Sequence, residues 1–157
     1  MKKMILSLVA VLMFTACGEM KIDSSTNATY KESIENMKNN LPVEKSQKFT
    51  EALEHIFIVQ TMKINDVPVY EVKKSMIRDG AIASAKKLNG NTADEVIKKG
   101  KVAKNKIECS STDDMIELIH DSIDKISELK HIDTTEKIKE YEGKLKEKID
   151  FHDKNCF

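Results

Sequence analysis

Residues 109–156 give the clearest indication of the architecture of this chain, and their sequence is CSSTDDMIELIHDSIDKISELKHIDTTEKIKEYEGKLKEKIDFHDKNC. Between Thr112 and Lys130, apolar residues recur at steps of three and four, namely Met115, Ile116, Ile119, Ile123, Ile126 and Leu129. This spacing is typical of one face of an amphipathic helix. A second such face follows residues 131–135 and consists of Ile138, Tyr141, Leu145 and Ile149, with Asp133 or Thr134 as its N-cap. Because the connection is short, we expect the two helices to lie antiparallel as a hairpin.

Two cysteines flank this predicted hairpin. The midpoint between Cys109 and Cys156 falls between residues 132 and 133, inside the connection. Residues equidistant from the turn of an antiparallel hairpin lie opposite one another, so we expect these cysteines to meet the Cα separation of roughly 5.5–6 Å that a disulfide needs. The spacing is not Cys-x-x-Cys, which favours a structural bond over a redox-active one.

Residues 1–16 have the features of a secretory signal peptide. Lys2 and Lys3 give a basic start, and an apolar run then extends from Met4 to Phe14. This run is shorter than the roughly 20 residues that a membrane-spanning helix needs, so we expect it to be cleaved. The stretch Phe14-Thr15-Ala16-Cys17 resembles the bacterial lipobox, in which the cysteine becomes the first mature residue and carries a diacylglyceryl group. The alternative is an unlipidated secreted protein, although ordinary signal peptidase prefers a small residue where Phe14 stands.

Acylation of Cys17 would have two consequences. Each buried methylene contributes about 0.8 kcal/mol, so two or three acyl chains should hold the protein on its membrane. Gly18-Glu19 replaces the aspartate that retains Gram-negative lipoproteins at the inner membrane, so the resemblance implies the outer membrane, facing the periplasm. Cys109 and Cys156 are then left to pair with each other in an oxidising compartment, where nucleic acid is not an expected partner.

The remaining sequence predicts an all-α chain organised as a small helical bundle with the disulfide-closed hairpin at its C-terminus. We expect a signal peptide at 1–16, a lipidated N-terminus and flexible tether at 17–29, a helical domain at 30–107 and the hairpin at 108–157. Within the helical domain, hydrophobic periodicity predicts helices over Tyr30–Asn40, Val43–Met62 and Val69–Leu88, with short β structure over Ile64–Tyr70 as the alternative. Thr92-Ala93-Asp94-Glu95 matches a capping box that opens another helix.

Several short motifs carry a resemblance to a family of uncharacterised bacterial lipoproteins. They are Lys21-Ile22-Asp23, Ser33-Ile34 with Met37, Leu41-Pro42, Phe49 with Ala52-Leu53, and the run from Leu88 to Ile97. The likeness covers roughly residues 1–100 and leaves the hairpin outside it. The resemblance implies a class and a location, but no activity.

The sequence holds only weak candidates for catalytic or metal-binding groups. Glu117 and His120 have the Glu-x-x-His spacing of di-iron bundles, but the sequence holds one copy where such a site needs two. His152 and Cys156 lie four residues apart, although the disulfide competes for that cysteine. We therefore expect no catalytic residue, no metal and no cofactor, and a protein that is not an enzyme. The alternative is a ligand- or metal-binding module, or an enzyme whose site gathers His55, Glu117 and His120.

Charge is distributed unevenly along the chain. Residues 63–107 hold eleven Lys or Arg against five Asp or Glu, whereas residues 108–157 hold eight against fourteen. The basic segment includes Lys86, Lys87, Lys98, Lys99, Lys101 and Lys104. One interpretation is that these lysines face anionic lipid or an anionic envelope polymer. The alternative is that they form a solvated face or attract the acidic hairpin. The leading expectation is a lipid-anchored envelope protein that binds another protein or an envelope component.

Overall fold

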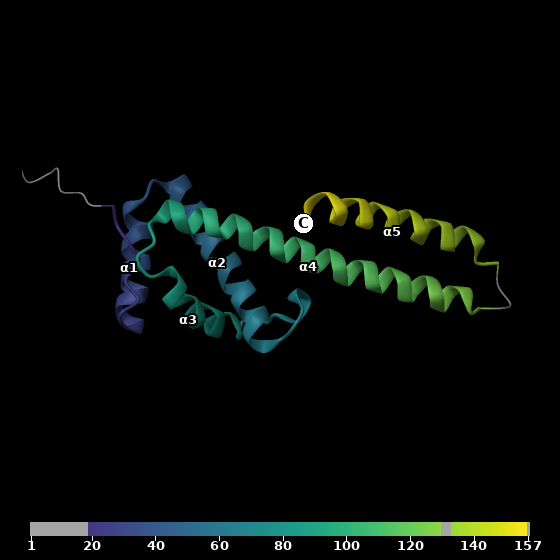
Figure 1. Ribbon diagram of the computed structural model, residues 1–157, viewed down its shortest axis with the longest axis horizontal. Helices are drawn as coiled ribbons and strands as arrows, with labels where there is room; N and C mark the ends of the chain where they lie inside the picture. Colours follow the sequence, from purple (N-terminus) through teal and green to yellow (C-terminus); the bar gives the residue numbers. More distant parts are fainter. Residues whose placement is uncertain (1–18, 130–132, 157) are drawn as a thin grey trace, which may run out of the picture.

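The computed structural model describes residues 19–129 and 133–156, and these residues form an all-α fold. The helices are α1 (Asn27–Asn40), α2 (Val43–Asn65), α3 (Ile77–Leu88), α4 (Ala93–Ser127) and α5 (Thr135–Asn155), with a 3-10 turn, η1, at Val69–Glu71. Figure 1 shows α1, α2 and α3 gathered around the first half of α4, while the second half of α4 extends away and packs against α5. We call residues 21–107 the body and residues 108–129 with 133–156 the hairpin. The signal peptide predicted at 1–16 and the lipidation predicted at Cys17 lie outside the described residues.

The N-terminal segment packs on the body. Ile22 is only 1% exposed, its N–H donates to the carbonyl of Asn91 at 2.9 Å, and its own carbonyl accepts from Gly90 at 2.8 Å. Lys21 faces Thr92 in an isolated antiparallel β-bridge. The prediction of a flexible tether is therefore wrong from Lys21 onward. One buried isoleucine and a pair of backbone hydrogen bonds fix this segment beside the start of α4.

Helix α1 begins three residues before the predicted Tyr30 because Thr26 caps it. Thr26 Oγ1 accepts from the N–H of Thr29 at 3.1 Å, and Thr29 Oγ1 accepts from the N–H of Thr26 at 3.0 Å. These reciprocal bonds form a capping box, in which threonine stands where glutamate or glutamine is usual. The backbone N–H of Thr29 in the first turn of α1 thus has a side-chain acceptor, although the first turn holds no acidic residue.

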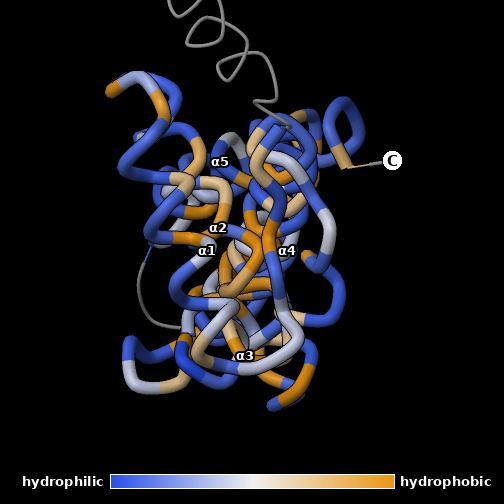
Figure 2. The backbone as a smooth tube through the Cα atoms, turned by 90° about the vertical axis from the view of Figure 1, so that its left-hand side faces the viewer, coloured by the Kyte–Doolittle hydropathy of each residue, from blue (hydrophilic) through white to orange (hydrophobic). Residues whose placement is uncertain are grey.

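The hydrophobic core lies where α1, α2, α3 and the first half of α4 meet. Phe49 and Val96 are 0% exposed, and Leu53 and Met37 are nearly as buried. Figure 2 shows orange, apolar stretches of tube turned toward the centre of the molecule. The complete set of buried apolar residues is Ile22, Tyr30, Ile34, Met37, Phe49, Ala52, Leu53, Ile56, Ala85, Leu88, Ala93, Val96 and Ala103. The buried residues of α1 and α2 recur at steps of about three and four along each helix, as expected of amphipathic helices that turn one face to the core.

The segment between α2 and α3 differs from both predictions made for it. Helix α2 continues to Asn65, which removes the start of the proposed β structure, and Asp66 then ends the helix in the left-handed conformation with φ 51°. The chain forms only the short turn η1 before α3 begins at Ile77, so the predicted helix start at Val69 is wrong, whereas the predicted end at Leu88 is confirmed. Gly80 in α3 lies against α2, and a Cβ there would come within 2.2 Å of the carbonyl oxygen of Phe57.

Helix α4 merges two helices that the sequence predicts separately. The predicted capping box opens it, with Thr92 N–H donating to Glu95 Oε2 at 2.8 Å. The polar residues that follow Ala103 have no apolar periodicity, yet the helix runs through them to Ser127. No glycine or proline interrupts this stretch, and Lys104 Nζ lies 3.6 Å from Glu108 Oε1 one turn on. The body and the hairpin therefore share one continuous helix.

The hairpin is confirmed as an antiparallel pair, α4 against α5. Its two helices are joined at the open end by the Cys109–Cys156 disulfide, and Figure 1 shows the end of α4 and the start of α5 at the opposite tip. At the start of α5, Asp133 Oδ1 accepts from the N–H of Thr135 at 3.1 Å, whereas the N-cap Thr134 makes no side-chain cap bond. No described residue of α5 is buried, because α4 is the main element packed against it.

Candidate functional site

Two of the predicted site residues, Cys109 and Cys156, lie in the described part of the chain and are joined by a disulfide. Cys109 and Cys156 have a Cα–Cα separation of 5.6 Å, within the range for disulfides. Cys109 lies in the middle of α4 and Cys156 follows the last turn of α5. The bond therefore ties the free end of α5 to a helix that continues into the body.

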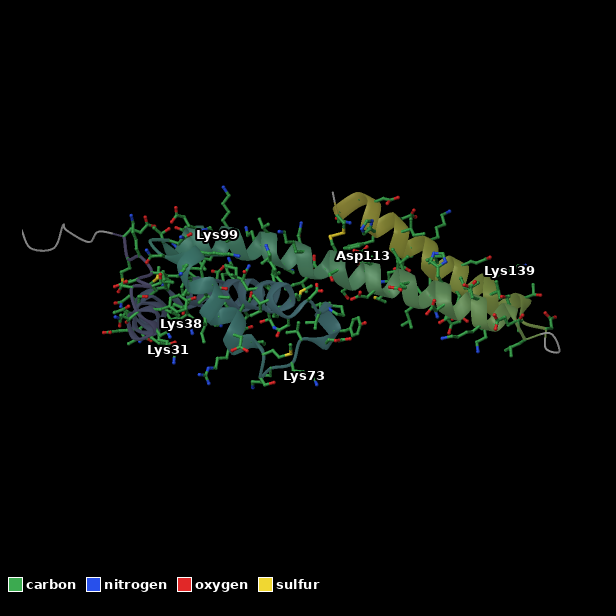
Figure 3. All side chains as sticks on the ribbon, turned by 60° about the horizontal axis from the view of Figure 1, so that its bottom comes forward. Lys31, Lys38, Lys73, Lys99, Asp113 and Lys139 are labelled. Atoms are coloured by element: carbon green, nitrogen blue, oxygen red, sulfur yellow. A yellow bond between two sulfur atoms is a disulfide. The ribbon has the colours of Figure 1, made fainter. Side chains whose placement is uncertain are left out.

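A polar contact between α4 and α5 lies one helical turn from the disulfide. His152 Nε2 is 3.0 Å from Asp113 Oδ1, and His152 Nδ1 is 3.7 Å from Asp153 Oδ1. Figure 3 shows Asp113 on α4 beside α5, close to the yellow sulfur atoms. Because the sulfur of Cys156 is held in the disulfide, it is not available as a thiolate to bind metal together with His152.

The structure does not bring the other candidate residues together. His55 on α2 lines a shallow groove beside Gly100 and Lys101 on α4, whereas Glu117 lines a different groove on the hairpin. The axial rise between residues 100 and 117 of one helix is about 25 Å, so His55 and Glu117 cannot share a substrate. In the ranges that the structure describes, no group of three or more His, Cys, Asp or Glu side chains could hold a metal ion.

A groove on the hairpin combines exposed apolar side chains with carboxylates. Tyr70 of η1 is 71% exposed, Leu118 of α4 is 67% exposed and Met115 is 42% exposed. They line a groove of about 520 Å³ whose other lining residues are Ser111, Asp114, Glu117 and Asp121. The lining thus holds three carboxylates and no cation. We call it the hairpin groove.

Asp114 is the least exposed of the three carboxylates that line the hairpin groove. Its Oδ2 is buried and has no hydrogen-bond partner among the described residues. Desolvation, and then the neighbouring charge of Asp113, raise the pKa of the Asp114 carboxyl. A donor or cation from outside the chain would relieve both effects. Asp114 and Tyr70 lie far apart in the chain and match no motif, so no sequence pattern predicts them as site residues.

A second groove lies in the body between α1, α2 and α3, with a volume of about 510 Å³. Its apolar lining is Tyr30, Ile34, Leu53, Phe57, Ala81 and Ile82, and its charged lining is Lys31, Glu35, Lys38, Glu54 and Arg78. Figure 3 shows Lys31 and Lys38 together at the α1 end of the molecule. We call this the body groove. No sequence pattern predicts any of its residues as part of a site.

The predicted basic segment lies along α3 and the first half of α4. Lys99 Nζ donates to the carbonyl of Lys87 at 3.2 Å, and Lys87 Nζ donates to Gln60 Oε1 at 2.6 Å. Among the described residues, the pair Lys104–Glu108 is the one ion pair between this segment and residues 108–156. Direct attraction between the basic segment and the acidic hairpin is therefore limited to neighbours on α4.

Comparison with known proteins identifies the family. A model for a family of unknown function, DUF6694, matches residues 3–105. The chain belongs to this family. The matched region ends near the point where the body meets the hairpin, so the family match includes neither cysteine of the disulfide. No curated protein and no solved structure matches the chain.

None of the described helices is long and apolar enough to cross a membrane.

Proposed function

We propose that this chain is a lipid-anchored protein of the bacterial cell envelope that binds a partner protein through the hairpin groove and performs no catalysis itself. The anchor is proposed at Cys17 on the strength of the lipobox-like Phe14-Thr15-Ala16-Cys17, with the outer membrane, facing the periplasm, as the location. No cofactor or metal is part of the proposal.

The anchor would hold the body close to its membrane. Lys21 is fixed by its bridge to Thr92, and only four residue steps separate it from Cys17. Four extended steps span at most about 14 Å, compared with roughly 40 Å for the dozen-residue tether expected from sequence. The start of α4 would thus be the membrane-proximal end.

The hairpin would then be the part available to partners away from the membrane. Helix α4 has 35 residues, which corresponds to a length of about 52 Å. In Figure 1 the described N-terminal end, near the start of α4, and the hairpin tip lie at opposite ends of the molecule. A long helix stapled to α5 would place the hairpin groove beyond the crowded membrane surface.

The observation that carries the binding proposal is the composition of the hairpin groove. Large apolar side chains are exposed side by side at Tyr70, Met115 and Leu118, which is a feature of interaction surfaces. The three carboxylates around them favour a partner segment that carries Lys or Arg, because complementary charge steers and orients association. We therefore propose a basic amphipathic helix as the partner element.

A defined peptide tests this proposal. Residues 19–157 contain every described element, so this chain can be titrated with a fluorescent 18-residue helix of Leu and Lys, and separately with its Leu and Glu counterpart. We expect saturable binding of the basic peptide, weakened by added salt. Replacement of Leu118 by Gln should weaken it about tenfold, the loss expected when an apolar contact of roughly 1–2 kcal/mol is removed.

Leu129→Gln is the matched control, because Leu129 is 51% exposed on the same helix hairpin and does not line the groove. Equal affinities of the two variants, or equal binding of the acidic peptide, would count against the groove. In cells, a photo-crosslinking residue at position 118 should then capture a partner that the same residue at position 129 does not.

An anionic envelope polymer is the second partner class. It is favoured by Lys87, Lys99 and Lys106, which surround the 57% exposed Val102 in a groove at the α2–α4 surface. Preferential binding of a polyanion, lost in Lys99→Gln and kept in Leu118→Gln, would favour this class over the protein partner.

A further inference from the structure

The body groove has the dimensions and lining of a small-molecule site. Its volume of about 510 Å³ lies within the range of ligand pockets, and three helices contribute to its walls. Leu53 and Phe57 come from α2 and Ala81 from α3, which makes the floor apolar. Helix α1 completes the groove with Ile34, and α1 otherwise packs sparsely against the rest of the body.

Charges around the body groove leave one positive charge uncompensated. Glu35 is paired with Lys38, whose Nζ lies 3.2 Å from its Oε1. Within the described ranges, Lys31, Arg78 and Glu54 take part in no ion pair. Two cations therefore share the groove with one free carboxylate, and a ligand carrying a single negative charge would balance it.

Tyr30 adds an independent observation. Its side chain lines the groove and is only 5% exposed, and its hydroxyl oxygen has no hydrogen-bond partner among the described residues. A buried hydroxyl without a partner is destabilising, so native proteins seldom keep one without a reason. A ligand oxygen that accepts from this hydroxyl, after a small shift of the side chains that cover it, supplies such a reason.

We propose that the body groove binds a small amphipathic anion, an alkyl chain that ends in a single carboxylate, with the chain on the α2–α3 floor and the carboxylate held by Lys31, Arg78 and Tyr30. The apolar floor selects the chain, and the uncompensated charge selects a monoanion. This site is separate from the hairpin groove and does not depend on the anchor or on a protein partner.

Calorimetric titration of residues 19–157 with laurate, kept below its micelle-forming concentration, tests the proposal. We expect one laurate per chain. Dodecyltrimethylammonium, which has the same chain length and the opposite charge, should bind at least tenfold more weakly. Equal affinity for the cation, no saturable binding of laurate, or binding only to phosphatidylglycerol vesicles would each overturn it.

Charge variants locate the ligand. The double variant Lys31→Gln with Arg78→Gln should bind laurate about tenfold more weakly, because it removes both cations that face the carboxylate. Lys73→Gln with Lys139→Gln removes the same charge from positions outside the groove and should leave the affinity unchanged. Tyr30→Phe should weaken laurate binding about fivefold while the fold, checked by circular dichroism, is kept. Equal losses in the two double variants would show that net charge, and not this groove, holds the anion.

Discussion

Gly100 on α4 lies directly against Ala52 on α2. A Cβ on Gly100 would be 2.3 Å from the Cβ of Ala52 and 2.4 Å from its Cα, so no side chain fits between the two helices. Gly100 is buried, and Ala52 is 4% exposed. This contact fixes how closely the long helix that carries the hairpin approaches the body.

Replacement of Gly100 by Ala should therefore destabilise the body. The added methyl group cannot be accommodated without moving α4 away from α2, and overpacking of this kind typically costs about 1–3 kcal/mol. Urea denaturation followed by circular dichroism measures the change. Gly143→Ala is the control, because Gly143 lies in α5 with nothing within 4 Å, so the substitution should stabilise by about 0.5–1 kcal/mol. Changes of the same sign in both variants would contradict the proposed close approach.

The N-terminal segment should contribute to stability through Ile22. Truncation of this buried side chain in Ile22→Ala should lower the free energy of unfolding by about 2–5 kcal/mol. Met20, two residues earlier, is 40% exposed, and Met20→Ala should change the free energy of unfolding by no more than about 0.5 kcal/mol. If both variants unfold at the same urea concentration as the parent, the segment is a tether after all.

Loss of the disulfide should affect the hairpin more than the body. In the chain-entropy model, closing a loop with a sequence separation of 47 stabilises by about 4 kcal/mol. Helix α5 has no buried residue to replace that contribution. In Cys109→Ser with Cys156→Ser, hydrogen exchange should therefore accelerate in α5 and stay unchanged around Phe49 in α2. Uniform acceleration in both helices would show that the hairpin and the body unfold as one unit.

Tyr30 should make stability depend on alkaline pH. Burial raises its pKa to about 12 from an ordinary value of 10.0, so the folded state keeps the phenolic proton where the unfolded state loses it. The contribution of Tyr30 to the free energy of unfolding is complete below pH 10 and is lost as the pH rises toward 12. Absorbance at a phenolate wavelength should show one tyrosine ionising near pH 12, and Tyr30→Phe should remove that step. Its persistence in the variant would assign the step to another residue.

The hairpin could be predicted from sequence because its determinants are local. Helical periodicity on each side of a short connection, with Cys109 and Cys156 equidistant from it, leaves little freedom in how the chain pairs. The capping box at Thr92 is equally local. The all-α fold and the disulfide were predicted on this basis and are confirmed.

The remaining features depend on tertiary contacts that carry no periodic signal. Ile22 lies in a largely polar stretch without helical periodicity, and its burial depends on the turn at Gly90, far away in sequence. Both grooves combine separate elements, as when Tyr70 of η1 lies beside Leu118 of α4. Their residues become recognisable only when the packing of the helices is known.

The proposed location and orientation both follow from the lipid anchor. Intact-mass spectrometry of the native protein extracted from membranes, before and after reduction, detects such an anchor. We expect a chain that begins at Cys17, carries two or three acyl chains and gains two hydrogen atoms when the disulfide is reduced. A chain without acyl groups, or one that begins at another residue, would overturn the proposed anchor.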